Sequence, residues 1–254
     1  MPTLPTTAAP TPAPAPRPTP GGVLAAMLAS DSTRPRLTCY VDTPGPSHGE
    51  RVELSARVLA NWVAKAANML QDDLDAAPAT TVGLDLPAHW RAFYWALATW
   101  SVGATLVVGP DASTADVVVT MDHRLADRVA QEAGLAVLVT LPMLARASLD
   151  TAADVVDEAR ELATHGDVFA PWEEADARSV AFHDRSGTEA YADVVVSQPD
   201  WGSSPRVRVP DRLGPALRAA LSAWAADGSV VLVIEPDGDQ SARLASEGVT
   251  LDLS

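Results

Sequence analysis

Cysteine and lysine are nearly absent from this sequence, and each absence excludes a class of protein. The single cysteine, Cys39, rules out an intrachain disulfide framework and any metal site built from several cysteines. Lys65 is the only lysine, so a mechanism that needs a lysine has one candidate. Lys and Arg together number 18 against 33 Asp and Glu, which gives a net charge of −15. Because phosphate contacts need clustered cations, this charge argues against nucleic acid or an anionic membrane surface as a partner.

Short motifs with an established chemistry are missing as well. The sequence contains no G-x-G-x-x-G, no G-x-x-x-x-G-K-[ST], no H-E-x-x-H and no G-x-S-x-G. No two of the five histidines are three or four positions apart, so local spacing gives no metal-binding pair. The motifs therefore predict no resident metal and identify no catalytic residue.

The N-terminus and one long uncharged run bear on location. Residues 1–20 hold eight of the 21 prolines, mixed with Thr and Ala, and predict a disordered arm rather than a secretory signal. Residues 92–110 are uncharged and approach the length of a membrane-spanning helix. Gly103 and several hydroxyl residues interrupt this run, so we expect a buried helix followed by a buried strand. These observations predict a cytoplasmic protein without a membrane partner.

Hydrophobic residues, which make up 47% of the chain, form short β-branched runs that alternate with segments of helical spacing. This alternation predicts an α/β fold of mainly parallel sheets covered by helices, over residues 21–254, with a subdivision near 140–178 left open. The expected strands are 37–42 and 51–54 (a hairpin), 81–86, 105–108, 117–120, 136–139, 179–183, 194–197, 230–234 and 249–253. The expected helices are 55–72, 88–102, 123–133, 152–164 and one opening at Pro215.

Two further segments attract attention. Residues 150–176 carry nine acidic residues and one basic residue, Arg160, and predict a solvated face with an exposed helix rather than a metal site. The run His183-Asp184-Arg185-Ser186-Gly187-Thr188 follows an apolar strand. A turn of this composition can wrap hydroxyls and backbone N–H groups around a phosphate, and it can equally be an ordinary β-turn.

The order of these segments resembles the adenylate-forming enzymes, which include acyl-CoA synthetases, peptide-synthetase adenylation domains and luciferases. The chain is similar to short actinobacterial proteins related to the N-terminal half of such AMP-binding enzymes. The resemblance implies the fold of the N-terminal domain of acyl-CoA synthetases, in truncated form. It is carried by Leu54-Ser55 with Leu59, Ala66 and Leu70, by Val82–Pro87, by Trp100, Gly103, Ala104 and Val107, and by Asp116–Thr120, Gly214–Val233 and Glu247–Leu251.

Departures from the family pattern shape the functional expectation. The family's phosphate loop reads roughly S-G-T-T-G-x-P-K-G, and only Ser186, Gly187 and Thr188 match it. Glu189 replaces the second Thr, Ala190 replaces a Gly, and Asp193 stands near the position of the lysine. Because a carboxylate repels polyphosphate, we predict a degenerate homologue that does not adenylate acids and acts by binding or regulation.

Two alternatives stay open at this stage. One is a residual nucleotide- or acyl-ligand-binding protein that uses Ser186–Thr188, with Arg185 or the pair Arg206 and Arg208 as cations. The other is a small adenylating enzyme completed by a separate subunit, which would bring ATP and Mg²⁺ as cofactors; otherwise no cofactor is expected. We also expect a homodimer or a protein partner to cover apolar surface that the truncation exposes.

Overall fold

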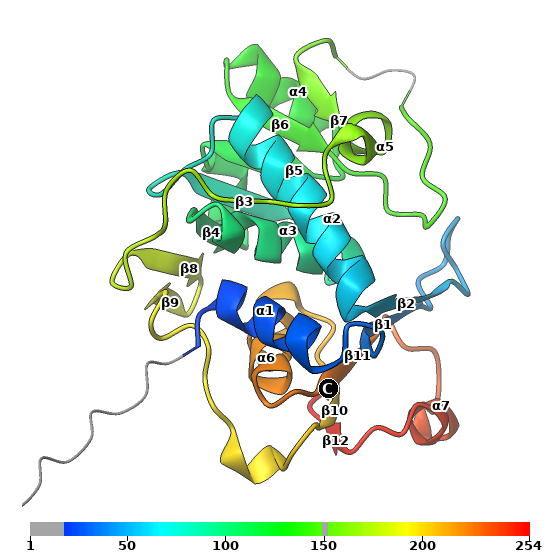
Figure 1. Ribbon diagram of the computed structural model, residues 1–254. Coiled ribbons are helices and arrows are strands. Elements are labelled where there is room, and N and C mark those ends of the chain that lie inside the picture. The colour runs from blue at the N-terminus through cyan, green and yellow to red at the C-terminus, as the bar shows by residue number, and fades with distance from the viewer. Residues whose placement is uncertain (1–17, 149–151) are drawn as a thin grey trace, which may run out of the picture.

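Two sheets with helices packed between them make up the structure (Figure 1). The computed structural model describes residues 18–148 and 152–254. Residues 1–17 of the predicted arm therefore lie outside the described residues. Helix α1 (Pro20–Asp31) begins at the last residue of that predicted arm, because the Thr19 side chain caps the helix by accepting a hydrogen bond from the Gly22 backbone N–H.

The larger sheet has the strand order β7-β6-β5-β3-β4-β8-β9 and is parallel except for β9, which runs antiparallel to β8. Strand β5 is buried at every position, as expected for a parallel strand that is covered on both faces. The strands are β3 (Thr81–Asp85), β4 (Thr105–Val108), β5 (Val117–Thr120), β6 (Leu135–Leu138), β7 (Val155–Asp157), β8 (Val180–Asp184) and β9 (Gly187–Ala190).

The smaller sheet has the order β12-β10-β11-β1-β2, and only its edge strand β2 is antiparallel, as the predicted hairpin requires. Cys39 lies on β1 opposite Val52. Burial raises the pKa of the Cys39 thiol to about 12, which makes it an unreactive core residue. The strands are β1 (Pro35–Val41), β2 (Arg51–Ser55), β10 (Arg206–Val209), β11 (Ser229–Ile234) and β12 (Leu251–Asp252).

Helix α3 (Trp90–Ser101) lies at the centre of the molecule. It packs on β3 and β4 of the larger sheet and also contacts β1 and helix α6 (Leu213–Ala225). Every residue from Trp90 to Trp100 is buried, so the uncharged run that begins at residue 92 opens with a core helix, as predicted. In the two described ranges, no helix is long and apolar enough to cross a membrane. The other helical segments are α2 (Ala56–Asn68) continuing into η1 (Met69–Asp73), η2 (Pro110–Thr114), α4 (His123–Gln131), α5 (Glu158–Glu161), η3 (Leu162–Thr164), η4 (Pro199–Trp201) and α7 (Ser241–Ser246).

Two predicted elements are wrong. Residues 152–164 do not form an exposed helix: β7 pairs with β6, and only α5 and η3 are helical. Glu158 is 2% exposed, because it forms an ion pair with the Arg91 guanidinium (3.1 Å) and accepts a hydrogen bond from the Trp95 indole N–H (2.8 Å). Residues 194–197 are not a strand, because the Val194 N–H turns back to the Ala190 carbonyl.

Candidate functional site at the turn between β8 and β9

The residues that resemble a phosphate loop lie on a tight hairpin. His183 pairs with Thr188 and Asp184 pairs with Gly187, which leaves Arg185 and Ser186 at the tip. Gly187 has a φ of +125°, a backbone conformation that side chains disfavour, so a glycine is needed to close this turn. The structure thus brings the predicted residues Ser186, Gly187 and Thr188 together on one exposed turn.

The hydroxyl and the N–H of Ser186 are both bonded to a carboxylate of the same hairpin. Asp184 Oδ1 accepts a hydrogen bond from the Ser186 backbone N–H (2.8 Å) and another from its Oγ (2.5 Å). These are two of the groups that a phosphate would need at this turn. The two polar donors of Ser186 therefore already have a partner within the turn, the Asp184 carboxylate.

A guanidinium from helix α6 completes the cluster. Arg218 contacts Asp184 Oδ2 through Nη1 (2.7 Å), Glu189 Oε1 through Nε (2.5 Å) and Ser186 Oγ through Nη2 (3.2 Å). Its Cζ lies 4.3 Å from the centroid of the Phe182 ring. We call Asp184, Ser186, Glu189 and Arg218 the turn cluster. In this cluster the carboxylates of Asp184 and Glu189 pair with one guanidinium, that of Arg218.

The pKa shifts follow from these contacts. Partial burial raises the pKa of the Asp184 carboxyl, but hydrogen bonds from Arg218 and Ser186 outweigh burial and lower it to about 2. Burial lowers the pKa of Arg218, and the bonds to Asp184 and Glu189 raise it above its ordinary value. At neutral pH Asp184 is ionised and its charge is paired with Arg218.

Helix α6 approaches the hairpin closely because its second residue is a glycine. A Cβ added at Gly214 would lie 2.7 Å from Asp184 Oδ2, so a side chain there would displace the carboxylate. The helix has no side-chain cap, and a carboxylate near its first turn interacts favourably with the positive end of the helix dipole. Gly214 therefore allows Asp184 to bridge the hairpin and the helix.

Of the cations that the sequence suggested, Arg185 lies exposed at the tip of the hairpin, whereas Arg206 and Arg208 are engaged elsewhere. Arg206 bonds to Thr38 and Ser229 on the smaller sheet and to Glu247 at the end of α7, and Arg208 pairs with Asp252 (3.1 Å). Sequence reasoning missed Arg218. The only signal for it was the apolar stripe of α6, which leaves Arg218 beside a buried face without saying what it meets.

The single lysine and the acidic residues provide no alternative centre. Lys65 Nζ forms an ion pair with Asp167 (2.8 Å) and donates to the carbonyls of Ala163 and His165, so it fastens this segment to α2. Within residues 18–148 and 152–254, no group of three or more His, Cys, Asp or Glu is arranged to hold a metal ion.

Comparison with known proteins shows where this fold occurs. No protein-family model matches the chain. A TIGR03089 family protein from Mycobacterium tuberculosis is 35% identical over 247 residues, which cover 91% of this chain and 96% of that protein. Acetoacetyl-CoA synthetase from Streptomyces lividans superposes with a TM-score of 0.70 at 17% identity, and the N-terminal domain of FACL13 from Mycobacterium tuberculosis with 0.67 at 14%. Both matches cover 92% of this chain, which spans only 42% and 62% of those two solved chains.

These findings agree with the resemblance that the sequence carries. At such low sequence identity, the superpositions on the solved structures establish the fold and nothing finer. The relative with 35% sequence identity, by contrast, aligns over nearly the whole length of both chains. The chain belongs to the TIGR03089 family and has the fold of the N-terminal domain of acyl-CoA synthetases and related adenylate-forming ligases.

Proposed function

We propose that this chain does not adenylate acids and acts instead as a binding protein built on the adenylate-forming fold. One observation supports this most: in the turn cluster, Asp184 and Glu189 occupy Arg218, the cation whose guanidinium contacts Ser186 Oγ. Adenylation needs preorganised donors and cations around the transferring phosphoryl group. Here the backbone N–H and the hydroxyl of Ser186 are both bonded to Asp184.

Electrostatics at this turn oppose a polyphosphate. A phosphate charge about 4 Å from the Glu189 carboxylate would be repelled by about 1 kcal/mol in water and about 4 kcal/mol at the effective dielectric of a protein surface. Asp184 adds a second negative charge, and the two carboxylates balance Arg218 and the exposed Arg185, so the turn offers a polyphosphate no net positive charge. Lys65, which lies on α2, is held by two backbone carbonyls and by Asp167. It therefore cannot replace the missing loop lysine.

A second candidate is residual binding of a nucleotide or an acyl ligand at the same turn. Ser186 and Thr188 are exposed, and the Arg218 guanidinium lies 3.2 Å from Ser186 Oγ. If a ligand displaced Glu189, this cation would become its partner. The two candidates differ in whether ATP binds to the native turn.

Binding of ATP and Mg²⁺, measured by thermal shift, separates them. A dissociation constant one hundredth of the ATP concentration would stabilise the fold by about 2.7 kcal/mol. At about 2–4 °C per kcal/mol for a domain of this size, the melting temperature would rise by several degrees. We expect no rise at about 1 mM ATP. A rise that is lost in Ser186→Ala and Thr188→Ala, but kept in the control Ser246→Ala at the end of α7, would establish the second candidate instead.

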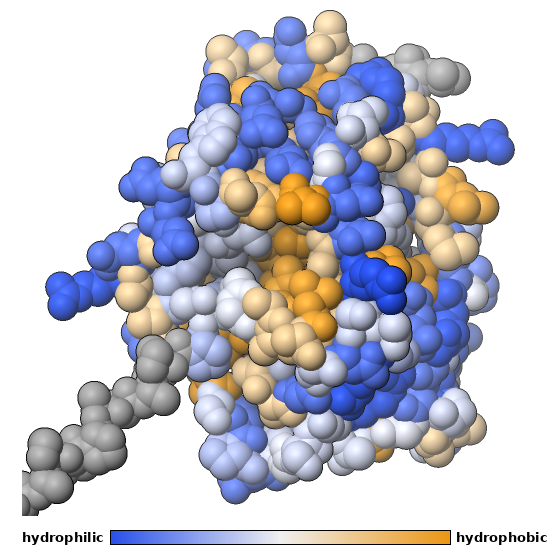
Figure 2. Space-filling view, in the orientation of Figure 1, coloured by the Kyte–Doolittle hydropathy of each residue, from blue (hydrophilic) through white to orange (hydrophobic). Residues whose placement is uncertain are grey.

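The proposal includes a cytoplasmic location and a homodimer or protein partner. Apolar side chains gather near the centre of the face drawn in Figure 2, close to α1 and α2. Large apolar residues that are well exposed include Trp172 (71%) and Val168 (85%), and the Trp172 backbone N–H is anchored to Gln71 (2.9 Å). Light scattering after size exclusion tests association: an assembly that weakens in Trp172→Ser supports it, and a monomer at every concentration contradicts it.

A further inference from the structure

A mainly apolar pocket near the strand ends is separate from the turn cluster. A pocket of about 490 Å³ lies between the loop that joins β1 to β2 and the ends of strands from both sheets. Its walls include Val41, Met121, Val139, Leu141 and Ile234. Known small-molecule sites have volumes of roughly 300–1,000 Å³ and mostly apolar linings. The pocket has the size and lining of such a site.

Its position in the fold also suits a ligand. Val41 ends β1, Ile234 ends β11, and Met121 and Val139 directly follow β5 and β6. All four are parallel strands, and in open α/β sheets ligands bind in crevices outside the carboxyl ends of such strands. Here the carboxyl ends of two sheets face one hollow.

One polar group in the pocket wall lacks a partner. The His89 side chain caps α3: its Nδ1 accepts a hydrogen bond from the Arg91 backbone N–H (3.3 Å). That bond leaves the proton of the neutral ring on Nε2, which is buried and has no hydrogen-bond partner among the described residues. Burial, aided by the positive charge of Arg91, lowers the pKa of His89 to about 3, so the ring is a neutral donor at pH 7.

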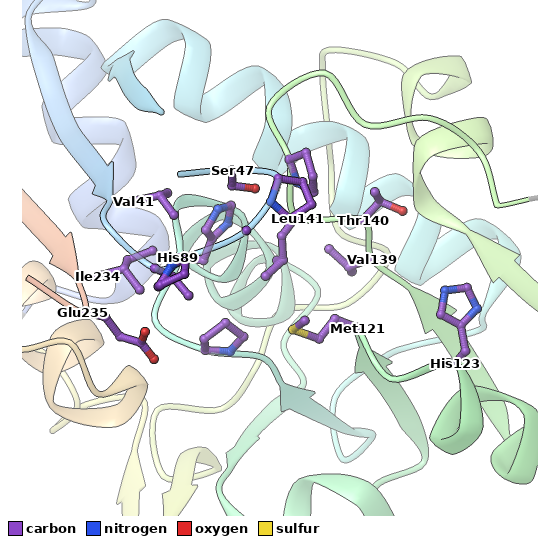
Figure 3. A pocket seen from close by; sticks show the side chains of 16 residues that line it. Val41, Ser47, His89, Met121, His123, Val139, Thr140, Leu141, Ile234 and Glu235 are labelled. Carbon is purple, nitrogen blue, oxygen red and sulfur yellow. The ribbon is translucent and has the colours of Figure 1, made fainter. Parts of the chain in front are cut away.

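Buried donors without partners are uncommon in native proteins and cost about 1–3 kcal/mol each. Figure 3 shows His89 in the middle of the lining side chains, with Ile234 and Glu235 on one side and Met121 and Val139 on the other. A ligand atom that accepts a hydrogen bond would satisfy this donor.

The wall beside His89 is fixed rather than loose. The buried Arg91 guanidinium donates to the carbonyls of Leu141 (3.3 Å) and Pro142 (3.0 Å), and it pairs with Glu158 on its other side. Arg91 therefore places Leu141 against the pocket, and its charge is already neutralised. Among the described residues that line the pocket, none is Arg or Lys, and Glu235 lies exposed at the edge.

We propose that this pocket binds a neutral, mainly apolar small molecule whose carbonyl oxygen accepts a hydrogen bond from His89 Nε2. A carboxylate is disfavoured, because Glu235 would repel it and no lining cation would neutralise it. The site is independent of the turn cluster, so it does not depend on whether ATP binds there.

Benzophenone and diphenylmethane, which differ in having a carbonyl or a methylene group between the two phenyl rings, are suitable probes. Calorimetric titration of the full chain should show benzophenone binding about three- to tenfold more tightly than diphenylmethane, the ratio expected for one hydrogen bond. Irradiation of the benzophenone complex should attach the probe to peptides that contain Met121 or Leu141. No benzophenone binding at 0.5 mM, or labelling elsewhere, would overturn the proposal.

His89→Asn provides the decisive variant. Asparagine keeps a side-chain oxygen to cap α3 but places no donor at the position of Nε2. Benzophenone affinity should fall to that of diphenylmethane, which itself should not change. Met121→Trp, at an exposed position, should weaken both probes by narrowing the pocket, and His183→Asn, outside it, should change neither. Equal affinity of the two probes for the native chain would mean that water alone satisfies His89, and would refute the assignment.

Discussion

The turn cluster and the pocket by His89 occupy different parts of one fold and have opposite chemistry. At the turn, Asp184 and Glu189 surround Arg218, and the polar groups are bonded to one another. At the pocket the lining is mostly apolar, and His89 Nε2 has no partner within the described residues. The difference teaches that the residues that resemble a known binding motif need not lie where the fold offers a ligand an open polar partner. The turn contains the residues that match the family's phosphate loop, whereas the pocket contains a hydrogen-bond donor without a partner.

The largest expected effect concerns the support behind the pocket. Arg91→Met would leave Glu158 charged and buried among Tyr94 and Trp95, and breaking such a pair costs about 3–5 kcal/mol. Urea unfolding should show this loss. Arg160→Met, which removes an exposed partner of Glu161, should change stability by less than about 1 kcal/mol. Similar losses in both variants would mean that the buried pair does not support the pocket wall.

A smaller effect is expected where α6 meets the hairpin. Gly214→Ala places a Cβ against Asp184 and should cost about 1–3 kcal/mol through displacement of the turn cluster. The same change in an Asp184→Ser background should be neutral or stabilising, because alanine favours a helix over glycine by about 1 kcal/mol. A double-mutant cycle by thermal unfolding measures the coupling. Additive effects would show that the two residues do not meet.

His89 should give the pocket region its own pH dependence. Its folded pKa of about 3 lies below the value of about 6.5 in the unfolded chain, so the unfolded chain binds the proton first. The stability contributed by neutral His89 is present above pH 6.5 and is lost as the pH falls toward 3, with a slope of up to about 1.4 kcal/mol per pH unit. His89→Asn should reduce the pH dependence of the free energy of unfolding in urea between pH 6.5 and 5, and His123→Asn should leave it unchanged. An unchanged slope in His89→Asn would contradict a buried neutral ring.

The smallest expected effect is at the partly exposed turn cluster. Arg218→Met should cost about 1 kcal/mol at low salt and less at high salt, because partly exposed ion pairs are screened. The pKa of about 2 for Asp184 lies below its unfolded value, so its stabilisation holds above about pH 4 and is lost as the pH falls toward 2. Arg218→Met should reduce this loss in acid unfolding curves. A variant as stable as the native chain at every salt concentration would mean that the cluster is not formed.

Much of the fold could be predicted because its strands are short apolar runs that can be recognised from the local sequence alone. Residues 105–108 and 117–120 are strands with the predicted bounds, and Ser55 caps α2 as its position suggested. The acidic segment could not be predicted in this way. Its Glu158 is buried only because Arg91, 67 positions away, provides a counter-charge, and sequence spacing contains no record of that pairing.

The candidate site shows the same limit. Ser186, Gly187 and Thr188 were found from a local pattern, and the structure places them on one turn. Arg218 lies 32 positions from Ser186 and reaches it only through the packing of α6. No sequence pattern distinguishes His89, and the missing partner of its Nε2 is visible only when the surrounding atoms are known. Contacts between distant segments decided both sites.

Pyrophosphate exchange tests the central claim most directly. The native chain would be assayed with ATP, Mg²⁺ and a panel of fatty, aryl and amino acids. Loss of one preorganised donor typically lowers a rate by about 10²–10³, and here Arg218 and Ser186 are both engaged by carboxylates. We predict no exchange with any acid. Exchange that disappears in Ser186→Ala and Thr188→Ala would show that the turn is a working phosphate loop and would contradict the account.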